Sequence, residues 1–324
     1  MKKHQISHFF FIVLFLIFGL EVVAQNKTKV SFLNQSKNKA AQSTIEKSVT
    51  KLLNNFNSGF LEAETEPDFT DVAISLEGKF AIKRLWQTQA FRCTELELKV
   101  NLLELPTGKG YEIRDIPLSL TLDDGSIQKE LGVFVFNLKG EIEDLYFGLG
   151  TQATKVTNGE DVTDLRLRKL ILDFAENFRT SYNRKDILFL QKVFSDNALI
   201  ITGKVIQEKP SKDMMGLAPA RVELIRQTKA QYMKRLRDVF KASRYIKVEF
   251  DSLEVVRHPA LPHIYGVNLV QNYATPNYSD RGYLFLLIDF RDENSPIIHV
   301  RAWQPSKETS GDSVLKLSDF PVED

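Results

Sequence analysis

Features that would identify a function directly are scarce in this chain of 324 residues. It contains one cysteine, Cys93, which excludes an internal disulfide and leaves the fold to depend on its core. Basic and acidic residues number 43 and 42, so no excess of one sign attracts nucleic acid or an anionic polymer. A phosphate-cradling glycine loop, a zinc-protease helix and a hydrolase nucleophile elbow are all missing. The sequence therefore indicates no cofactor, and it assigns no catalytic class.

Long apolar runs are also missing, apart from one near the N-terminus. Lys2 and Lys3 precede the apolar residues 9–20, and small residues follow up to Ala24. This is the pattern of a secretory signal peptide. A membrane-spanning helix needs about 20 apolar residues, so an uncleaved anchor is the less favoured alternative. We expect residues 1–24 to be removed, leaving a periplasmic or secreted protein without a transmembrane anchor and away from nucleic acid.

The first half of the mature chain has the pattern of an α+β domain over residues 43–148. Residues 25–42 are mostly polar, which predicts a flexible lead. Ser43 and Glu46 have the spacing of a capping box, so a long amphipathic helix is expected to begin there. Four segments with turn residues between them then predict an antiparallel meander: 95–105, 111–122, 128–137 and 141–147.

Residues 149–163 are poor in large apolar side chains, and they are expected to be a linker between two domains. A second domain is predicted over residues 164–305, with a tail at 306–324. Asp164 has the position of an N-cap for its first helix, and a short second helix is expected after Asn183. The remaining elements are expected to be a strand at 198–206, a helix at 221–242, and strands at 245–257, 264–274, 282–291 and 297–304.

Two stretches of the second half carry a resemblance to a known family, Phe174-Ala-Glu-Asn-Phe-Arg-Thr-Ser-Tyr-Asn-Arg-Lys-Asp186 and Val193-Phe-Ser-Asp-Asn-Ala-Leu-Ile-Ile-Thr202. Together with the element order, they resemble the nuclear-transport-factor-2-like (NTF2-like) superfamily, also called SnoaL-like or ketosteroid-isomerase-like. The resemblance implies helices packed in a curved, mostly antiparallel sheet, with a ligand or a catalytic site at the mouth of this cone. The first half resembles a degenerate second copy, so two tandem cone-like α+β domains are expected. The sheet face is a candidate surface for a homodimer.

Candidate site residues lie on the last two predicted strands. His299, Arg301 and Trp303 alternate along the final strand, opposite an aliphatic set. The favoured alternative is that the aliphatic set faces the core and the polar set faces solvent. The candidate ligand-binding residues are His299, Arg301, Trp303, Tyr283 and Asp289. No general base can be assigned, and His258 with His263 is too small a set to indicate a metal.

Basic residues cluster along the predicted helix 221–242. One flank of that helix carries a set of cations separated from its apolar stripe: Arg226, Lys234, Arg237, Lys241 and Arg244. A solvated face is the favoured explanation, and contact with an anionic surface is the alternative.

The function expected from these patterns is ligand or partner binding in the cell envelope, with an unknown small molecule or envelope protein as the partner. The alternative is a small-molecule lyase, isomerase or hydrolase of the ketosteroid-isomerase type. A closed apolar pocket with an inward Asp or His would favour the enzyme, whereas a filled cone with exposed aromatic patches would favour assembly with a partner.

Overall fold

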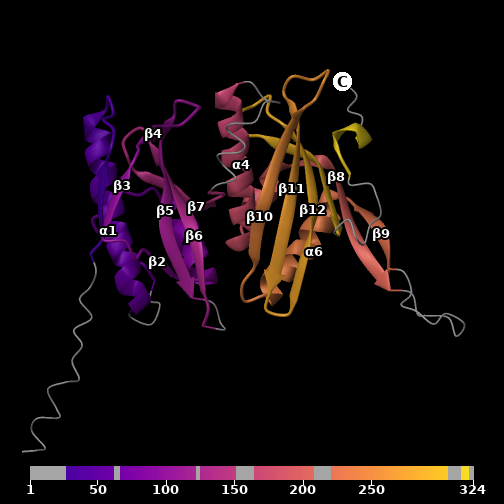
Figure 1. Ribbon diagram of the computed structural model, residues 1–324, viewed down its shortest axis with the longest axis horizontal. Coiled ribbons are helices and arrows are strands. Elements are labelled where there is room, and N and C mark those ends of the chain that lie inside the picture. The colour runs from indigo at the N-terminus through magenta and orange to yellow at the C-terminus, as the bar shows by residue number, and fades with distance from the viewer. Residues whose placement is uncertain are drawn as a thin grey trace, which may run out of the picture.

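A computed structural model describes residues 27–61, 66–121, 125–150, 164–207, 220–305 and 315–320. The predicted signal peptide lies outside these ranges. The described chain forms two α+β halves that lie side by side, with the helix α4 (Leu165–Asn183) between their sheets (Figure 1). Each half packs helices on a curved, mostly antiparallel sheet, as predicted.

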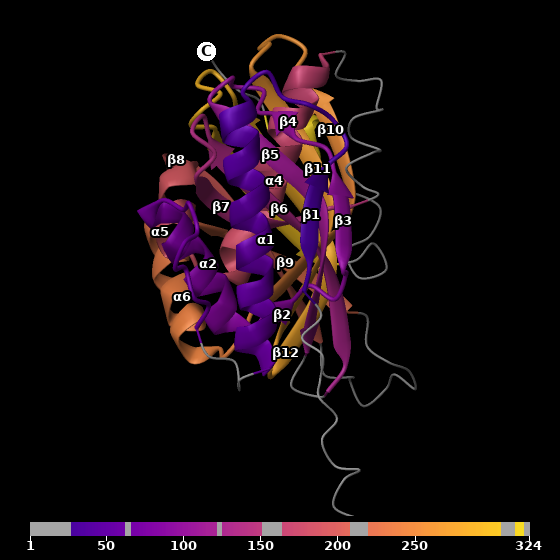
Figure 2. The ribbon, with the colours of Figure 1, turned by 90° about the vertical axis from the view of Figure 1, so that its left-hand side faces the viewer.

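The first half is built on a five-stranded antiparallel sheet and a separate parallel pair of strands. The sheet has the order β2-β5-β6-β7, with β4 also paired to β5, and β1 pairs with β3. Figure 2 shows α1 in front, with α2 to one side and β1 and β3 to the other. The elements are β1 (Lys29–Phe32), α1 (Lys39–Leu61), α2 (Leu76–Thr88), β2 (Phe91–Arg92), β3 (Glu97–Val100), β4 (Leu103–Glu104), β5 (Gly110–Thr121), β6 (Ile127–Asn137) and β7 (Ile142–Gly148).

The predicted flexible lead at 25–42 is wrong over its described part. Val30 is fully buried in the first core, because the short strand β1 packs against α1 and pairs with β3. The helix α1 begins at Lys39, before the predicted Ser43, since the Asn38 side chain accepts a hydrogen bond from the backbone N–H of Ala41. Asn38 was the N-cap signal that the Ser43 prediction missed.

The second half follows the predicted element order with one additional strand. Its six-stranded sheet has the order β10-β11-β12-β13-β8-β9, in which β13 and β8 form a parallel pair and every other pair is antiparallel. The elements after α4 are α5 (Ile187–Val193), β8 (Phe194–Gln207), β9 (Ala220–Gln227), α6 (Lys229–Ala242), β10 (Lys247–Arg257), β11 (Ile264–Thr275), β12 (Tyr278–Asp289), β13 (Ile297–Pro305) and the 3-10 turn η1 (Leu317–Asp319).

Two local predictions in this half are corrected. Residues 221–227 belong to the strand β9 and not to a helix, and α6 starts at Lys229 behind a capping box of Thr228 and Gln231. The short helix α5 is capped by Asp186, whereas Asn183 ends α4 and hydrogen-bonds through its side chain to the backbone of Val248.

The predicted boundaries at 149 and 306 need revision as well. Leu149 is buried in the second core and does not behave as linker, while residues 151–163 lie outside the described ranges. The tail is not loose over Leu315–Phe320: the ring of Phe320 stacks on that of Phe285 at 5.2 Å. The backbone N–H of Leu315 also donates to Oε1 of Gln304 at 2.6 Å. The helices of the second half pack on one face of its sheet, which we call the inner face. The C-terminal segment covers an apolar patch on the opposite face, which we call the outer face.

Candidate functional site

A β-bulge at His299 divides the predicted site residues between the two faces of the sheet. The register between β12 and β13 shifts there, so that Ile298 pairs with Ile288 and Val300 with Leu287. As a result, Ile298 joins the core around the helices, whereas Val300 and Ala302 join the apolar patch on the outer face. The prediction assumed that side chains alternate strictly between the two faces, and a bulge interrupts this alternation.

Arg301 and Trp303 lie on the inner face, inside the cone. Arg301 is 6% exposed, and its guanidinium carbon lies 5.2 Å from the ring centre of Tyr232 on α6. The Tyr232 hydroxyl is 2.7 Å from that of Tyr182 on α4. Burial raises the pKa of Tyr182 well above its usual value, so its phenol is neutral. The buried cation of Arg301 is stabilised by the face of the Tyr232 ring.

The interior around Arg301 is filled. Its Nε and Nη1 atoms are fully buried and have no hydrogen-bond partner among the described residues, and the same is true of the indole nitrogen of Trp303. Asp280 also faces inward from β12, where burial raises its pKa. Because these atoms are inaccessible and lie among the side chains of the second core, the surroundings of Arg301 are packed and not an open pocket.

Asp289 and His299 lie on the outer face. Nε2 of His299 is 3.4 Å from Oδ2 of Asp289, which also accepts a hydrogen bond from Nε of Arg291 at 2.8 Å. Burial acts to raise the pKa of Asp289, but the hydrogen bonds from Arg291 outweigh it and hold that pKa below its usual value. The carboxylate is therefore committed to an ion pair with Arg291.

Tyr283 lines a groove of about 850 Å³ on the outer face of the sheet. One wall is formed by β10–β12, and the other by the C-terminal segment Leu315–Phe320. The lining combines aliphatic and aromatic side chains with charged and polar ones. The lining residues are Ser252, Glu254, Val256, Arg257, His258, Pro259, Asn268, Leu269, Val270, Tyr283, Leu315, Lys316, Leu317, Ser318 and Phe320.

A smaller cavity of about 440 Å³ lies near the turn between β11 and β12, and most of the residues that line it are charged or polar in type. Arg281 there pairs with Asp251 at 2.6 Å and donates to Asn272 at 3.0 Å. Because these side chains satisfy one another, the larger groove is the better candidate for a ligand.

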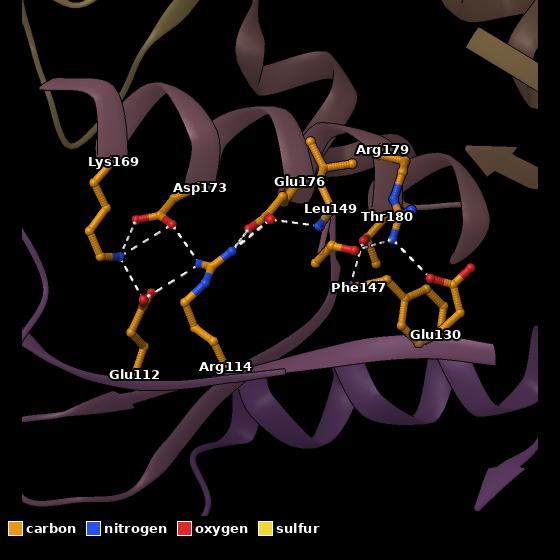
Figure 3. Close-up of polar contacts among 11 residues, drawn as sticks. Glu112, Arg114, Glu130, Phe147, Leu149, Lys169, Asp173, Glu176, Arg179 and Thr180 are labelled. Atoms are coloured by element: carbon orange, nitrogen blue, oxygen red, sulfur yellow. Dashed lines mark hydrogen bonds and ion pairs between the residues drawn. The ribbon is translucent and has the colours of Figure 1, made fainter. Parts of the chain in front are cut away.

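A buried network of charges joins the two halves, and the sequence did not predict it (Figure 3). At its centre, Arg114 of β5 reaches Glu176 of α4 at 2.5 Å and Asp173 at 3.0 Å. Lys169 lies 2.6 Å from Glu112 and 3.0 Å from Asp173. The side chains of Glu112 and Glu176 are completely buried. We call these five residues the joint.

Further contacts extend this interface along α4. Arg179 pairs with Glu130 of β6 at 3.2 Å, and Arg184 pairs with Asp144 of β7 at 2.7 Å. The backbone N–H of Leu149 donates to Glu176 at 2.7 Å. The charged side of α4, which amphipathicity alone assigns to solvent, therefore faces the first half.

Burial and neighbouring carboxylates perturb the titration of the joint. Burial and then Glu112 raise the pKa of Asp173 to about 7, against the opposing effect of Lys169 and Arg114. Burial also raises the pKa of Glu176. Perturbed carboxyl groups often mark functional sites, but here each has a partner across the interface, and the arrangement is that of a structural connection.

The predicted basic flank is only partly assembled. Lys234, Arg237 and Lys241 are exposed on α6, and Arg244 is exposed just beyond its end. Arg226 lies on β9 opposite Ile201, which belongs to the outer apolar patch, so it lies on the other side of the sheet. The sequence placed it wrongly because 221–227 was expected to be helical.

None of the helices in the described ranges is long and apolar enough to span a bilayer. No group of three or more His, Cys, Asp or Glu in those ranges is arranged to hold a metal ion. His258 is instead a turn residue, whose Nδ1 accepts hydrogen bonds from the backbone N–H groups of Ala260 and Leu261.

Comparison with known proteins gives matches only among solved structures, since no family model and no curated protein matches the chain. Bd1075 of Bdellovibrio bacteriovorus is 15% identical with a TM-score of 0.32, over 50% of this chain and 45% of that one, so the chain spans less than half of that protein. ActVI-ORFA of Streptomyces coelicolor is 11% identical with a TM-score of 0.31, over 43% of this chain and 96% of that one. A protein of the NTF2-like family from Streptomyces avermitilis is 9% identical with a TM-score of 0.31, over 42% and 94%.

Proposed function

We propose that the protein is an exported binding protein of the cell envelope that holds an elongated, largely apolar ligand on the outer face of its second-half sheet. The observation that carries this proposal is the groove of about 850 Å³ beside Tyr283, on a sheet whose inner face is filled. Export is supported by the N-terminal pattern of Lys2, Lys3 and the short apolar run after them.

The lining of the groove favours an apolar ligand with a polar end. Val256, Val270 and Leu317 provide aliphatic surface, and Tyr283 adds an aromatic ring with a hydroxyl. Glu254, Arg257 and His258 also line the groove and can orient a polar group. A volume of this size is in the range of small-molecule sites, which are mostly apolar with a few polar groups.

Catalysis of the ketosteroid-isomerase type is less well supported. It needs a substrate to reach a titratable group inside the cone, next to Asp280 or the Tyr182–Tyr232 pair. Tyr182 and Tyr232 are both buried, so a substrate has little access to that pair. A filled cone of this kind favours a binding module.

The test uses the mature full-length chain and the fluorescent apolar dye anilinonaphthalene sulfonate. Val270→Asp and Tyr283→Asp put a charge on the groove lining, and we expect each to weaken dye binding at least about tenfold. Ile127→Asp is the matched control, because Ile127 is 63% exposed in the first half and far from the groove in sequence. Equal binding by all four proteins, or no saturable binding by the wild type, would overturn the proposal.

A further inference from the structure

The helix α6 carries the densest positive charge of the second half. Between Lys229 and Arg244 the sequence has six basic residues and one acidic residue, in a chain whose charges otherwise nearly cancel. Lys234, Arg235, Arg237 and Lys241 are all exposed on the helix. A local field of this kind can attract an anionic surface although the protein as a whole has almost no net charge.

The packing of α6 fixes the direction of this charge. Tyr232, Met233, Leu236 and Phe240 are buried in the cone, so the helix cannot turn its other side inward. With 3.6 residues per turn, Lys234, Arg237 and Lys241 fall within about 60° of one another around the helix axis. They form a stripe that faces away from the sheet, and we call these residues with Arg235 the basic face.

Cations at the interface between the halves and at the start of α6 have carboxylate partners, whereas no ion pair is found for those of the basic face within the described ranges. Arg114, Arg179 and Arg184 have carboxylate partners at the interface between the halves. At the start of α6, Lys229 pairs with Asp196. Within the described ranges, no ion pair involves any of the four residues of the basic face. Their charge is therefore available for an external partner.

A further cation and an aromatic side chain extend the basic face. Nζ of Lys185 donates to the carbonyl groups of Ser243 and Arg244, and so lies at the C-terminal end of α6. Tyr278, the first residue of β12, is 57% exposed and lies within electrostatic range of Arg235, while its hydroxyl donates to Oδ2 of Asp280 at 2.7 Å. An exposed aromatic ring next to Lys and Arg is typical of surfaces that contact lipid headgroups.

We propose that the basic face docks the protein on an anionic lipid surface. The contact is with headgroups and not with acyl chains, because the apolar side of α6 is already buried in the cone. It is therefore electrostatic and sensitive to salt. Because α6 covers the inner face of the sheet and the groove lies on the outer face, a docked molecule keeps the groove turned away from the membrane.

The test is co-sedimentation of the mature full-length chain with phosphatidylcholine vesicles that contain or lack phosphatidylglycerol. We expect binding only to the anionic vesicles, strongest at low salt. The variant Lys234→Glu/Arg237→Glu/Lys241→Glu should bind about a hundredfold more weakly, since each basic residue near the surface contributes independently.

The matched control is Lys39→Glu/Lys47→Glu/Lys51→Glu, which makes the same charge change at exposed positions of α1. The two variants have the same net charge, so any effect of net charge alone weakens their binding equally. Beyond that shared effect, the control should bind the anionic vesicles like the wild type. Failure of the wild type to bind anionic vesicles at low salt, or equal loss in the two variants, would overturn the proposal. Binding to soluble polyglutamate with no binding to vesicles would overturn the lipid proposal and indicate that the basic face binds an acidic protein partner.

Discussion

The two sides of the second-half sheet use polar residues in opposite ways. On the inner side, Arg301 lies over the ring of Tyr232, whose hydroxyl contacts that of Tyr182. Further buried polar contacts of α4 form the joint with the first half. On the outer side, Tyr283 and its neighbours border an open groove. The difference indicates that charge in the interior serves to hold the fold together, whereas the exposed face is available for binding. Substitutions on the two sides should therefore differ in kind.

The largest effect is expected at the joint. Arg114→Ala leaves Glu176 buried without its cation, which should lower the free energy of unfolding by about 3–5 kcal/mol. Arg281→Ala is the control, because Arg281 is an exposed partner in a surface ion pair and its loss should cost no more than about 1 kcal/mol. Urea unfolding followed by circular dichroism measures both. Similar losses of unfolding free energy in the two variants would mean that the joint does not stabilise the interface between the halves.

The joint should also make the two halves unfold together. The chain has two tryptophans, Trp86 in the first core and Trp303 in the second, so Trp303→Phe and Trp86→Phe variants report each half separately. We expect one shared midpoint in the wild-type background and two separate midpoints after Arg114→Ala. Two midpoints in the wild-type background would mean that the halves are independent.

A smaller loss is expected inside the cone. Arg301→Ala removes the cation over Tyr232 and leaves space in the core, so it should cost about 2–4 kcal/mol. Arg301→Met fills a similar volume without a charge and should recover much of that loss. Neither variant should change dye binding while it is folded. Lost binding by a folded Arg301→Met protein would place the ligand site inside the cone.

The joint also predicts a dependence of stability on pH. The pKa of Asp173 is about 7 in the folded protein, above its usual value of 3.8, so the folded state binds more protons between these values. Stability is then greatest below the unfolded pKa and falls as the pH rises through the folded pKa. Thermal melts between about pH 4 and about pH 8 should show this decline, and Asp173→Asn should weaken it. Equal slopes in the two proteins would contradict the assignment.

The smallest effect on stability is expected on the outer face. Phe320→Ala removes a half-buried ring stacked on Phe285, and this should cost about 1 kcal/mol. Because Phe320 also forms part of the groove wall, dye binding should weaken several-fold. A change in stability without any change in dye binding would show that the C-terminal segment covers the patch but does not shape the groove.

Periodicity and turn residues predicted most of the second-half fold, because the apolar stripe of α4 and the alternating strands carry a strong local signal. The failures had local causes of two kinds. One was an overlooked cap: Asn38 and Thr228 each begin a helix at a position other than the one predicted. The other was the bulge at His299, which has no reliable signature in a single sequence.

The joint escaped prediction for a different reason. Lys169, Asp173 and Glu176 form a charged stripe, and such a stripe normally faces solvent. Only the three-dimensional placement of β5 against α4 reveals that Arg114 neutralises it. Among the predicted site residues, Tyr283 was placed at the groove by the structure, whereas Arg301 and Trp303 were placed in the core.

The most direct test of this account is a crystal structure of residues 25–324 with anilinonaphthalene sulfonate bound. The account predicts electron density for the dye between β10–β12 and the segment Leu315–Phe320, in contact with Tyr283. Density on the helix side of the sheet, beside Arg301 and Tyr232, would contradict it.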